Sequence, residues 1–185
     1  MDLRSLCDAV SAGEEFEYLL FWGHTPKVPR VIDATCLSQW YPAPFTVDGV
    51  TYATAEHWMM AAKARLFGDD DALARILAST DPREVKALGR AVRGFDTDRW
   101  DAHRLPQVVE GNVHKFGQSE PLRSFLLATG DRVLVEASPR DRIWGIGMGA
   151  SNERARDPRE WRGKNLLGFA LMEARTQLRA EGESR

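Results

Sequence analysis

The chain has 185 residues, 43% of them hydrophobic and 28% charged, with a formal net charge of -2 at pH 7. This composition suits one compact domain with a sizeable core, and the nearly balanced charge gives no reason to expect strong binding to duplex nucleic acid. Acidic residues interrupt the N-terminal segment, no apolar run is long enough to cross a membrane, and the two cysteines fit a reducing compartment, so we expect a cytoplasmic protein without a signal peptide.

The N-terminal part of the chain carries few strong local signals. Residues 1–15 are expected to form a helical or loose lead-in, followed by a single domain over residues 16–179 and a frayed tail over residues 180–185. Residues 30–35 are interpreted as a strand. The adjacent aromatic residues Phe21 and Trp22 fit either a core pair or the wall of a pocket.

Two short alternating runs flank the dipeptide Asp48-Gly49, which is preferred in tight hairpin turns, and they predict a β-hairpin over residues 45–52. The second strand leads directly into an amphipathic helix over residues 54–67. Thr54 is its expected cap, because its side-chain oxygen can accept a hydrogen bond from a free N–H group of the first turn. A rigid corner between hairpin and helix would hold the first helical residues in place.

This helix carries an acid and an amine on one face. Glu56 lies in the first turn and Lys63 follows seven residues later, so both project from the same stripe about two turns apart. Such pairs are commonly solvated on surface helices. Here Trp58, Ala61 and Ala62 indicate a helix packed on most sides, where a charged group without a purpose or a partner is costly. We therefore take Glu56 and Lys63 as candidate catalytic residues.

The rest of the chain is predicted to be mainly helical. Apolar periodicity and capping residues predict helices over residues 69–78, 81–93, 98–116, 119–129 and 166–178. Pro106 must kink the third of these or start a new segment, because proline removes a backbone donor. Residues 132–137 resemble a strand, and residues 138–163 are rich in loops. The elements favour an α+β fold, a single mainly helical domain with a small antiparallel sheet.

Two pairs on the predicted helices are further candidates. Trp100 and Arg104 lie at helical spacing and are either part of a binding site or a core ring beside a surface arginine. Lys115 precedes Phe116, which on its own favours a lysine that extends past a core ring to solvent. Local spacing does not decide between these alternatives.

The segment over residues 141–147 places an acid, a tryptophan and spaced glycines directly after the predicted strand. Glycine lets a ligand approach the backbone closely, although Gly145 and Gly147 lack the strand–helix context of a dinucleotide fingerprint. With Asp141 and Trp144 they suit a pocket for a planar base attached to a sugar phosphate. Aromatic faces would stack on the base and carboxylates would act at the sugar.

Other chemistries have less support. The four histidines have no ligand-like spacing, and the sequence contains neither a nucleophile elbow nor a P-loop. We therefore expect no metal and no cofactor.

An ordered set of short motifs runs through the chain: TAEHW at 54–58, AKA at 62–64, KF at 115–116, LLATG at 126–130, LVEA at 134–137, DRIWGIG at 141–147 and GKNLLG at 163–168. In this order the motifs resemble the YbiA-like, or NADAR, family of N-glycosidases over roughly residues 16–179. The resemblance implies a mainly helical α+β fold and cleavage of a C–N glycosidic bond. Known substrates of the family are early riboflavin-pathway intermediates and ADP-ribose attached to guanine bases.

The resemblance also implies roles for particular residues. Glu56, Trp100 and Asp141 match family residues linked to activity, and Lys63 matches a lysine proposed in some members to form a Schiff base with the opened ribose. The family commonly has Ser-Asn where this chain has Ser38-Gln39, which leaves open any amide contact from position 39. The full substrate-binding set that we expect comprises Ser38, Trp40, Trp100, Arg104, Trp144, Gly145, Gly147 and Asn165.

In the expected mechanism, Glu56 stays ionised because the helix dipole favours negative charge in the first turn, and it stabilises an oxocarbenium-like state. Asp141 activates water or steers the ribose hydroxyls, and a desolvated Lys63 attacks an open-chain aldehyde. The expected partner is a sugar-phosphate or nucleotide substrate, with ADP-ribosylated guanine in nucleic acid as one form. The alternative is a non-catalytic sensor that binds ADP-ribose or NAD, although binding alone does not need a buried amine.

Overall fold

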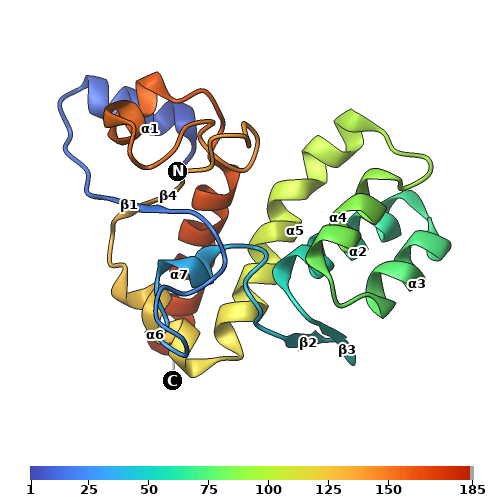
Figure 1. The fold of residues 1–185 in the computed structure, drawn as a ribbon. Coiled ribbons are helices and arrows are strands. Elements are labelled where there is room, and N and C mark those ends of the chain that lie inside the picture. The colour runs from blue at the N-terminus through green and yellow to red at the C-terminus, as the bar shows by residue number, and fades with distance from the viewer. Residues whose placement is uncertain (184–185) are drawn as a thin grey trace.

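A computed structural model of the chain describes residues 1–183 and shows a mainly helical α+β domain (Figure 1). The helices of this part of the chain are α1 (Leu3–Ser11), α2 (Ala55–Phe67), α3 (Asp70–Ala78), α4 (Pro82–Arg90), α5 (Thr97–Gly117), α6 (Glu120–Ala128) and α7 (Leu166–Glu183). The strands are β1 (Tyr18–Phe21), β2 (Phe45–Val47), β3 (Val50–Tyr52) and β4 (Val133–Glu136). Short 3₁₀ turns cover Ala34–Leu37, Glu153–Arg156 and Pro158–Glu160.

The strands form two separate pairs. β2 and β3 make the predicted antiparallel hairpin, and its turn places Asp48 and Gly49 at φ 49° and 79°, as a type I′ turn requires. β1 and β4 make a parallel pair with Tyr18 opposite Val133 and Phe21 opposite Glu136. The prediction of a purely antiparallel sheet was therefore incomplete, because the partner of β1 lies more than a hundred residues along the chain.

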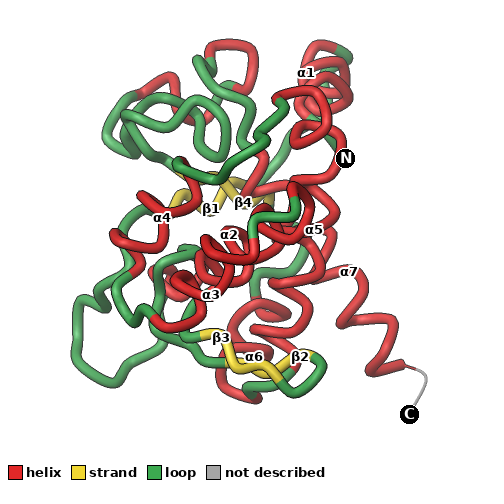
Figure 2. Tube along the Cα trace, turned by 90° about the vertical axis from the view of Figure 1, so that its right-hand side faces the viewer, coloured by secondary structure: helices red, strands yellow, loops and turns green. Residues whose placement is uncertain are grey.

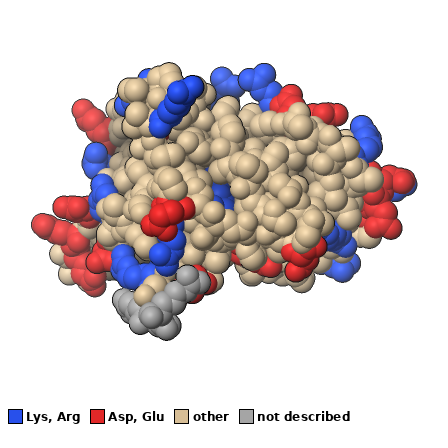
Figure 3. All heavy atoms as spheres, turned by 90° about the horizontal axis from the view of Figure 1, so that it is seen from below, with Lys and Arg blue, Asp and Glu red and all other residues tan. Residues whose placement is uncertain are grey.

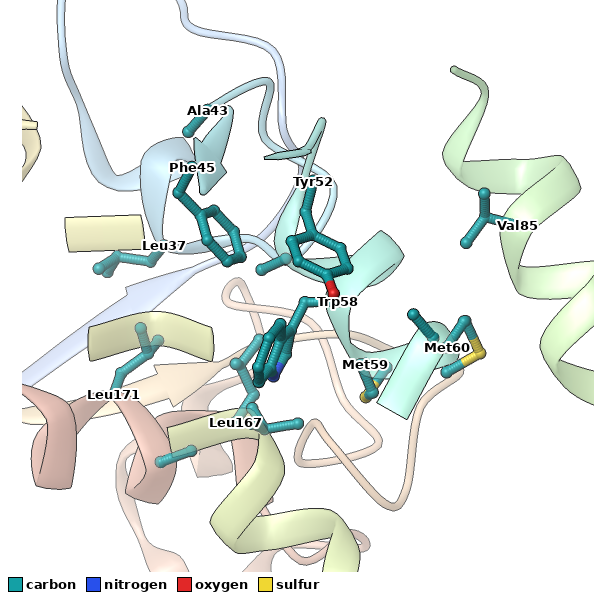
Figure 4. Packing of buried hydrophobic residues seen from close by; sticks show 14 of the residues in the cluster. Leu37, Ala43, Phe45, Tyr52, Trp58, Met59, Met60, Val85, Leu167 and Leu171 are labelled. Carbon is teal, nitrogen blue, oxygen red and sulfur yellow. The ribbon is translucent and has the colours of Figure 1, made fainter. Parts of the chain in front are cut away.

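Helix α2 is the central element of the fold. Thr54 caps it as predicted, and residues 55–64 are all buried because α3, α4 and α5 pack around it. Figure 4 shows Trp58 of this helix against Phe45 and Tyr52 of the hairpin, with Leu167 of α7 nearby. The Trp58 indole also donates a hydrogen bond to the carbonyl of Gln107, 2.7 Å away. Glu56 and Lys63 lie on this buried part of α2, so their charged groups are largely removed from solvent.

Helices α5 and α7 pack against each other, and α7 also packs on β4 (Figure 2). Helix α7 confirms the helix predicted over residues 166–178, and its Leu167, Leu171, Ala174 and Leu178 are all buried. Helix α5 runs through Pro106 as one element, so the proline does not begin a new segment. The helix tolerates this proline because Pro106 lies on an exposed face. Water there can donate a hydrogen bond to the carbonyl that loses its N–H partner.

Several local expectations were wrong. Residues 30–35 do not form a strand; Asp33 instead caps the 3₁₀ turn that follows it. Ser119 stands at the start of α6 but makes no capping hydrogen bond. Helix α7 continues to Glu183 where a frayed tail from residue 180 was expected, and residues 184–185 of that tail lie outside the described residues.

The charged side chains lie mainly around the periphery in the view of Figure 3, with a largely uncharged centre. Within residues 1–183, no helix is both long enough and apolar enough to cross a membrane.

The contact between α7 and β4 provides a test of the fold. A Cβ atom at Gly168 would lie 2.0 Å from the carbonyl oxygen of Leu134, a backbone atom that cannot move freely. We expect Gly168→Ala to lower the free energy of unfolding by about 1–3 kcal/mol, measured by urea denaturation. Gly182→Ala in the same helix is the matched control, because its Cβ would meet only the flexible end of Arg123. The control should change stability by no more than about 1 kcal/mol; equal effects at both positions would contradict the packing described here.

Candidate active site

A cavity of about 1090 Å³ opens where the carboxyl ends of β1 and β4 meet helices α2 and α4. Segments 22–25 and 138–144, which follow the two strands, form one side, and segment 38–40 closes another. The carboxyl ends of neighbouring parallel strands share one edge of a sheet, so the loops that follow them meet there. The parallel pairing of β1 and β4 thus assembles a pocket from distant parts of the sequence.

Glu56 enters this cavity from the first turn of α2 and is only 3% exposed. Its backbone N–H donates to the carbonyl of Gln39, 3.0 Å away, which satisfies one free donor of the helix start and ties α2 to the segment 38–40 wall. The Trp40 side chain donates a hydrogen bond to the Glu56 carboxyl. Backbone and side chain are therefore both held in place.

The expectation that Glu56 stays ionised rested on the helix dipole alone and left out the effect of burial. Burial raises the pKa of Glu56 to about 7, with a further increase from Asp141 and opposing effects from Lys86 and Trp40. A helix dipole contributes about 0.3–1 kcal/mol at an exposed helix end. Removing a carboxylate from water costs several kcal/mol, so desolvation outweighs the dipole. Glu56 therefore changes its protonation near neutral pH.

Lys63 lines the same cavity two turns further along α2 and is 9% exposed. Its ammonium group donates to the carbonyl of Gly89, 2.7 Å away, and lies 4.0 Å from the centroid of the Phe95 ring. Within the described chain it has no carboxylate partner, and burial lowers its pKa. An amine with a lowered pKa is easier to deprotonate, which is what a nucleophilic lysine requires.

Asp141 lies in the loop after β4 and also faces the cavity. Its Oδ1 accepts hydrogen bonds from the backbone N–H groups of Ile143 and Trp144, both at 2.8 Å, which fixes the turn. The Gly147 N–H donates to the Asp141 carbonyl, 2.9 Å away. Asp141 is thus a rigid member of the cavity wall.

Sequence reasoning assigned no role to Glu136, the last residue of β4, although its motif was noted. Its side chain is 9% exposed and lines the cavity. Burial raises the pKa of Glu136 to about 8, with a further increase from Asp141 and an opposing effect from Lys86. The cavity therefore holds two titratable glutamates, on opposing elements of the fold.

Four cations that were also missed line the cavity: Lys86, Arg90, Arg140 and Arg142. Among the residues that the structure describes, none of these side chains has a hydrogen bond or an ion pair with another residue. They come from α4 and from the loop after β4, two segments whose local patterns carry no sign of a shared site. Their charges leave one part of the cavity suited to an anion.

Aromatic rings complete the wall. Trp40 contacts both His24 and Lys86. Its ring centroid lies 5.7 Å from that of His24 and 5.6 Å from the Lys86 ammonium group. Trp144 is half-buried and lines the same cavity, as does Trp22, which is 63% exposed. The sequence left open whether Phe21 and Trp22 belong to the core or to a pocket wall. Phe21 belongs to the core, whereas Trp22 lines the cavity.

Two predicted binding residues do not reach the cavity. Trp100 is 8% exposed, belongs to the core and has its ring centroid 5.8 Å from the Lys63 ammonium group. It therefore packs behind Lys63 and is not placed to stack on a ligand. Arg104 is buried and pairs with Asp101 at 2.8 Å, one turn away on the same helix. Helical spacing alone gave no information about which way α5 faces.

Gly145, Gly147 and Asn165 shape the site from behind and do not line it. A Cβ atom at Gly145 would lie 2.8 Å from the carbonyl oxygen of Glu136, and Gly147 has a positive φ of 69°. The Asn165 side chain accepts from the N–H of Glu136 at 3.0 Å and donates to the carbonyl of Leu134 at 2.9 Å. These residues fix the loop and strand that carry Asp141 and Glu136.

Ser38, one of the expected substrate-binding residues, lines the cavity, and a buried lysine holds its segment in place. Lys115 is 1% exposed, and its ammonium group donates to the carbonyls of Cys36 and Ser38 at 2.6 and 2.8 Å. The expectation that Lys115 extends to solvent was therefore wrong. Burial lowers the pKa of Lys115 to about 7. The neighbouring Gln39 side chain accepts from Asn112 at 3.1 Å. Within residues 1–183, no cluster of His, Cys, Asp and Glu side chains is arranged to hold a metal ion.

The NADAR domain profile matches residues 20–179, which is most of the chain and contains every cavity-lining segment. The chain belongs to the NADAR family. Residues that line the cavity therefore lie within the part of the chain that defines the family.

Several members of the family are similar to this chain over most of its length. N-glycosidase R617 of Acanthamoeba polyphaga mimivirus is 43% identical over 169 residues, which covers 89% of this chain and 98% of that protein. N-glycosidase YbiA of Escherichia coli strain K12 is 33% identical over 138 residues, covering 75% of this chain and 78% of that protein. The NMR structure of E. coli YbiA aligns with a TM-score of 0.74 and 28% identity over 93% of this chain and 90% of that chain. The predicted YbiA-like α+β fold is thus confirmed.

In this NADAR domain, the buried carboxyl of Glu56 should make the free energy of unfolding decrease as pH rises. Its pKa is 4.5 in the reference state and about 7 in the fold, so the folded protein keeps a proton that the unfolded chain releases. The stability linked to this proton is present below the lower value and lost as pH rises through the higher one.

We therefore expect the free energy of unfolding to fall between about pH 5 and about pH 7, and to fall less in Glu56→Gln, because an amide does not ionise. Urea denaturation at both pH values measures the difference. Glu181→Gln, an exposed position near the end of α7, should keep the wild-type dependence. An identical pH dependence in wild type and Glu56→Gln would contradict the burial of this carboxyl.

Proposed function

We propose that this chain is an N-glycosidase that hydrolyses the C–N bond between a phosphorylated ribose and a base. The observation that carries the proposal is the convergence of Glu56, Lys63 and Asp141 on one cavity. A carboxyl that titrates near neutral pH, an amine with lowered pKa and a rigidly held second carboxylate are groups that glycosidic cleavage uses. The names of the relatives from mimivirus and E. coli support the same reaction class.

The substrate that we propose carries phosphate. Lys86, Arg90, Arg140 and Arg142 line the cavity without ion-pair partners in the described chain, and guanidinium groups bind phosphate oxygens in bidentate fashion. Two substrates fit: ADP-ribose attached to guanine, and the early riboflavin-pathway ribosylamino-pyrimidine phosphates. Both join a planar base to a phosphorylated ribose.

The aromatic wall supports a planar base at the other side of the ligand. Trp40 and Trp144 line the cavity, as does Trp22, whose side chain is exposed. Stacking of a base on an aromatic side chain contributes about 1–3 kcal/mol. A cavity of about 1090 Å³ has room for a nucleotide-sized ligand.

In the proposed reaction the ionised form of Glu56 stabilises positive charge on the ribose as the C–N bond breaks. Asp141 orients a water molecule or the ribose hydroxyls. Once the base has left, the ribose can open to an aldehyde, and the neutral amine of Lys63 can add to that carbon and lose water to form an imine. About 10 Å of helical rise separates the Glu56 and Lys63 backbones, which leaves space for a sugar between their side chains.

The direct test is product analysis after incubation with ADP-ribosylated guanosine and, separately, with the ribosylamino-pyrimidine phosphate. We expect release of the free base from at least one of them, and a loss of at least about a hundredfold in turnover in Glu56→Gln, because the charge that stabilises the transition state is removed. Binding of either compound without release of the base, even at high enzyme concentration, would support a sensor and overturn the proposal. Near-normal turnover by folded Glu56→Gln would remove Glu56 from the mechanism.

Lys63 has a separate test. Borohydride added during turnover should reduce the imine and join the sugar covalently to the protein, and peptide mass mapping should locate it on Lys63. Lys63→Arg should abolish trapping, because guanidinium stays charged and cannot form an imine. Lys164→Arg, a change at an exposed lysine outside the cavity lining, should leave trapping in place. Turnover without trapping, or trapping at a different lysine, would favour direct attack by water with Asp141 as the base.

A further inference from the structure

Glu136 differs from the other buried ionisable side chains that line or support the cavity. Lys63 donates to the carbonyl of Gly89, Lys115 donates to those of Cys36 and Ser38, and Glu56 accepts from Trp40. Glu136 as a residue is 9% exposed, and its carboxyl has no hydrogen bond or ion pair with any other residue in the described part of the chain. A buried carboxyl that lacks a protein partner is costly, so its retention calls for a ligand.

The backbone around Glu136 is fixed from several sides. Its N–H donates to the Asn165 side chain at 3.0 Å, and its carbonyl accepts from the N–H of Ile146 at 3.0 Å. Gly145 lies so close to that carbonyl that a Cβ atom there would be 2.8 Å from the oxygen. The N–H of the next residue, Ala137, donates to the carbonyl of Phe21 in the paired strand β1, 2.8 Å away. The structure thus fixes the backbone from which the Glu136 side chain reaches the cavity wall.

We propose that Glu136 donates the proton to the leaving base, an inference that rests on the proposed N-glycosidase function. It reaches the cavity from the end of β4, whereas Glu56 reaches it from α2. Glu56, Glu136 and Asp141 all line this cavity, and Asp141 and Lys86 act on the pKa of both glutamates. Burial keeps Glu136 neutral at physiological pH, and a neutral acid has a proton to give.

The proton balance is complete without another reactant. As the C–N bond breaks, its electron pair moves to the base nitrogen, which takes the proton from the Glu136 carboxyl. Glu136 becomes a carboxylate and Glu56 stabilises the cationic sugar. Water then bonds to the sugar carbon, which leaves a hydroxyl on the sugar and returns a proton to Glu136. The Lys63 amine adds only later, to the aldehyde of the opened sugar. The net reaction adds one water molecule across the C–N bond.

Leaving groups of different kinds separate this role from a structural one. Wild type and Glu136→Gln are compared on whichever N-linked substrate wild type cleaves, and on a 4-nitrophenyl ribofuranoside 5-phosphate, whose nitrophenolate leaves as a stable anion. We expect Glu136→Gln to lose at least about a hundredfold in kcat on the N-linked substrate and less than about tenfold on the nitrophenyl compound. Equal losses on both, or wild-type turnover of the N-linked substrate, would overturn the role of proton donor.

The pH profile gives a second readout. For wild type, kcat/KM on the N-linked substrate should fall as pH rises through about 8, because an ionised Glu136 has no proton to donate. Glu136→Gln should lack this alkaline limb while keeping any acidic limb from Glu56, and an unchanged alkaline limb would contradict the proposal. Other charged or titratable groups line the same cavity and remain in both proteins: His24, Glu56, Lys63, Lys86, Arg90, Arg140, Asp141 and Arg142.

Controls distinguish this proposal from the function on which it rests. Glu181→Gln, at an exposed position of α7, should match wild type on both substrates. A thermal melt of Glu136→Gln should show a folded protein, because the amide keeps the size of the side chain. If wild type cleaves neither substrate, the proposed function fails; if wild type cleaves the N-linked substrate and Glu136→Gln does so equally well, only the role of Glu136 fails.

Discussion

Removal of water from one carboxyl group, that of Glu56, is the constraint on which the site depends. The first turn of α2 carries this side chain into the interior, and burial raises its pKa to about 7. The surrounding structure makes that position unavoidable, since α2 is packed by α3, α4 and α5 and its start is tied to Gln39. A more solvated helix would leave an ordinary ionised glutamate, without the change of protonation near neutral pH that the proposed chemistry uses.

The other side of the site depends on the parallel pairing of β1 with β4. This pairing brings Trp22 and His24, which follow β1, next to the loop after β4 that carries Asp141 and Trp144. It also places Glu136 at the edge of the cavity as the last residue of a strand. Helix α7 and Asn165 then lock β4 from behind. The site therefore combines one helix start with one sheet edge, and a change in either would separate its carboxyls.

Features that depend on neighbours in sequence were predictable. The turn at Asp48-Gly49, the cap at Thr54 and the common face of Glu56 and Lys63 follow from local geometry, and the structure contains all of them. Features that depend on distant contacts were not. The orientation of α5 decides that Trp100 packs behind Lys63, and the partner of β1 decides that Glu136 lines the cavity. The effect of burial on Glu56 was missed for the same reason: helix position is local, whereas solvent exclusion is set by the whole fold.

The most direct test of this account is a carbon-13 NMR titration of the glutamate side-chain carboxyl carbons, with signals of Glu56 and Glu136 assigned from single glutamine variants. The account predicts that Glu56 titrates near pH 7 and Glu136 near pH 8, while exposed glutamates titrate near the usual value of about 4.3. Together the two signals would show one glutamate that changes protonation near neutral pH and a second that keeps its proton to higher pH. Titration of both groups near the usual value would mean that water reaches them freely, and would contradict the desolvated site.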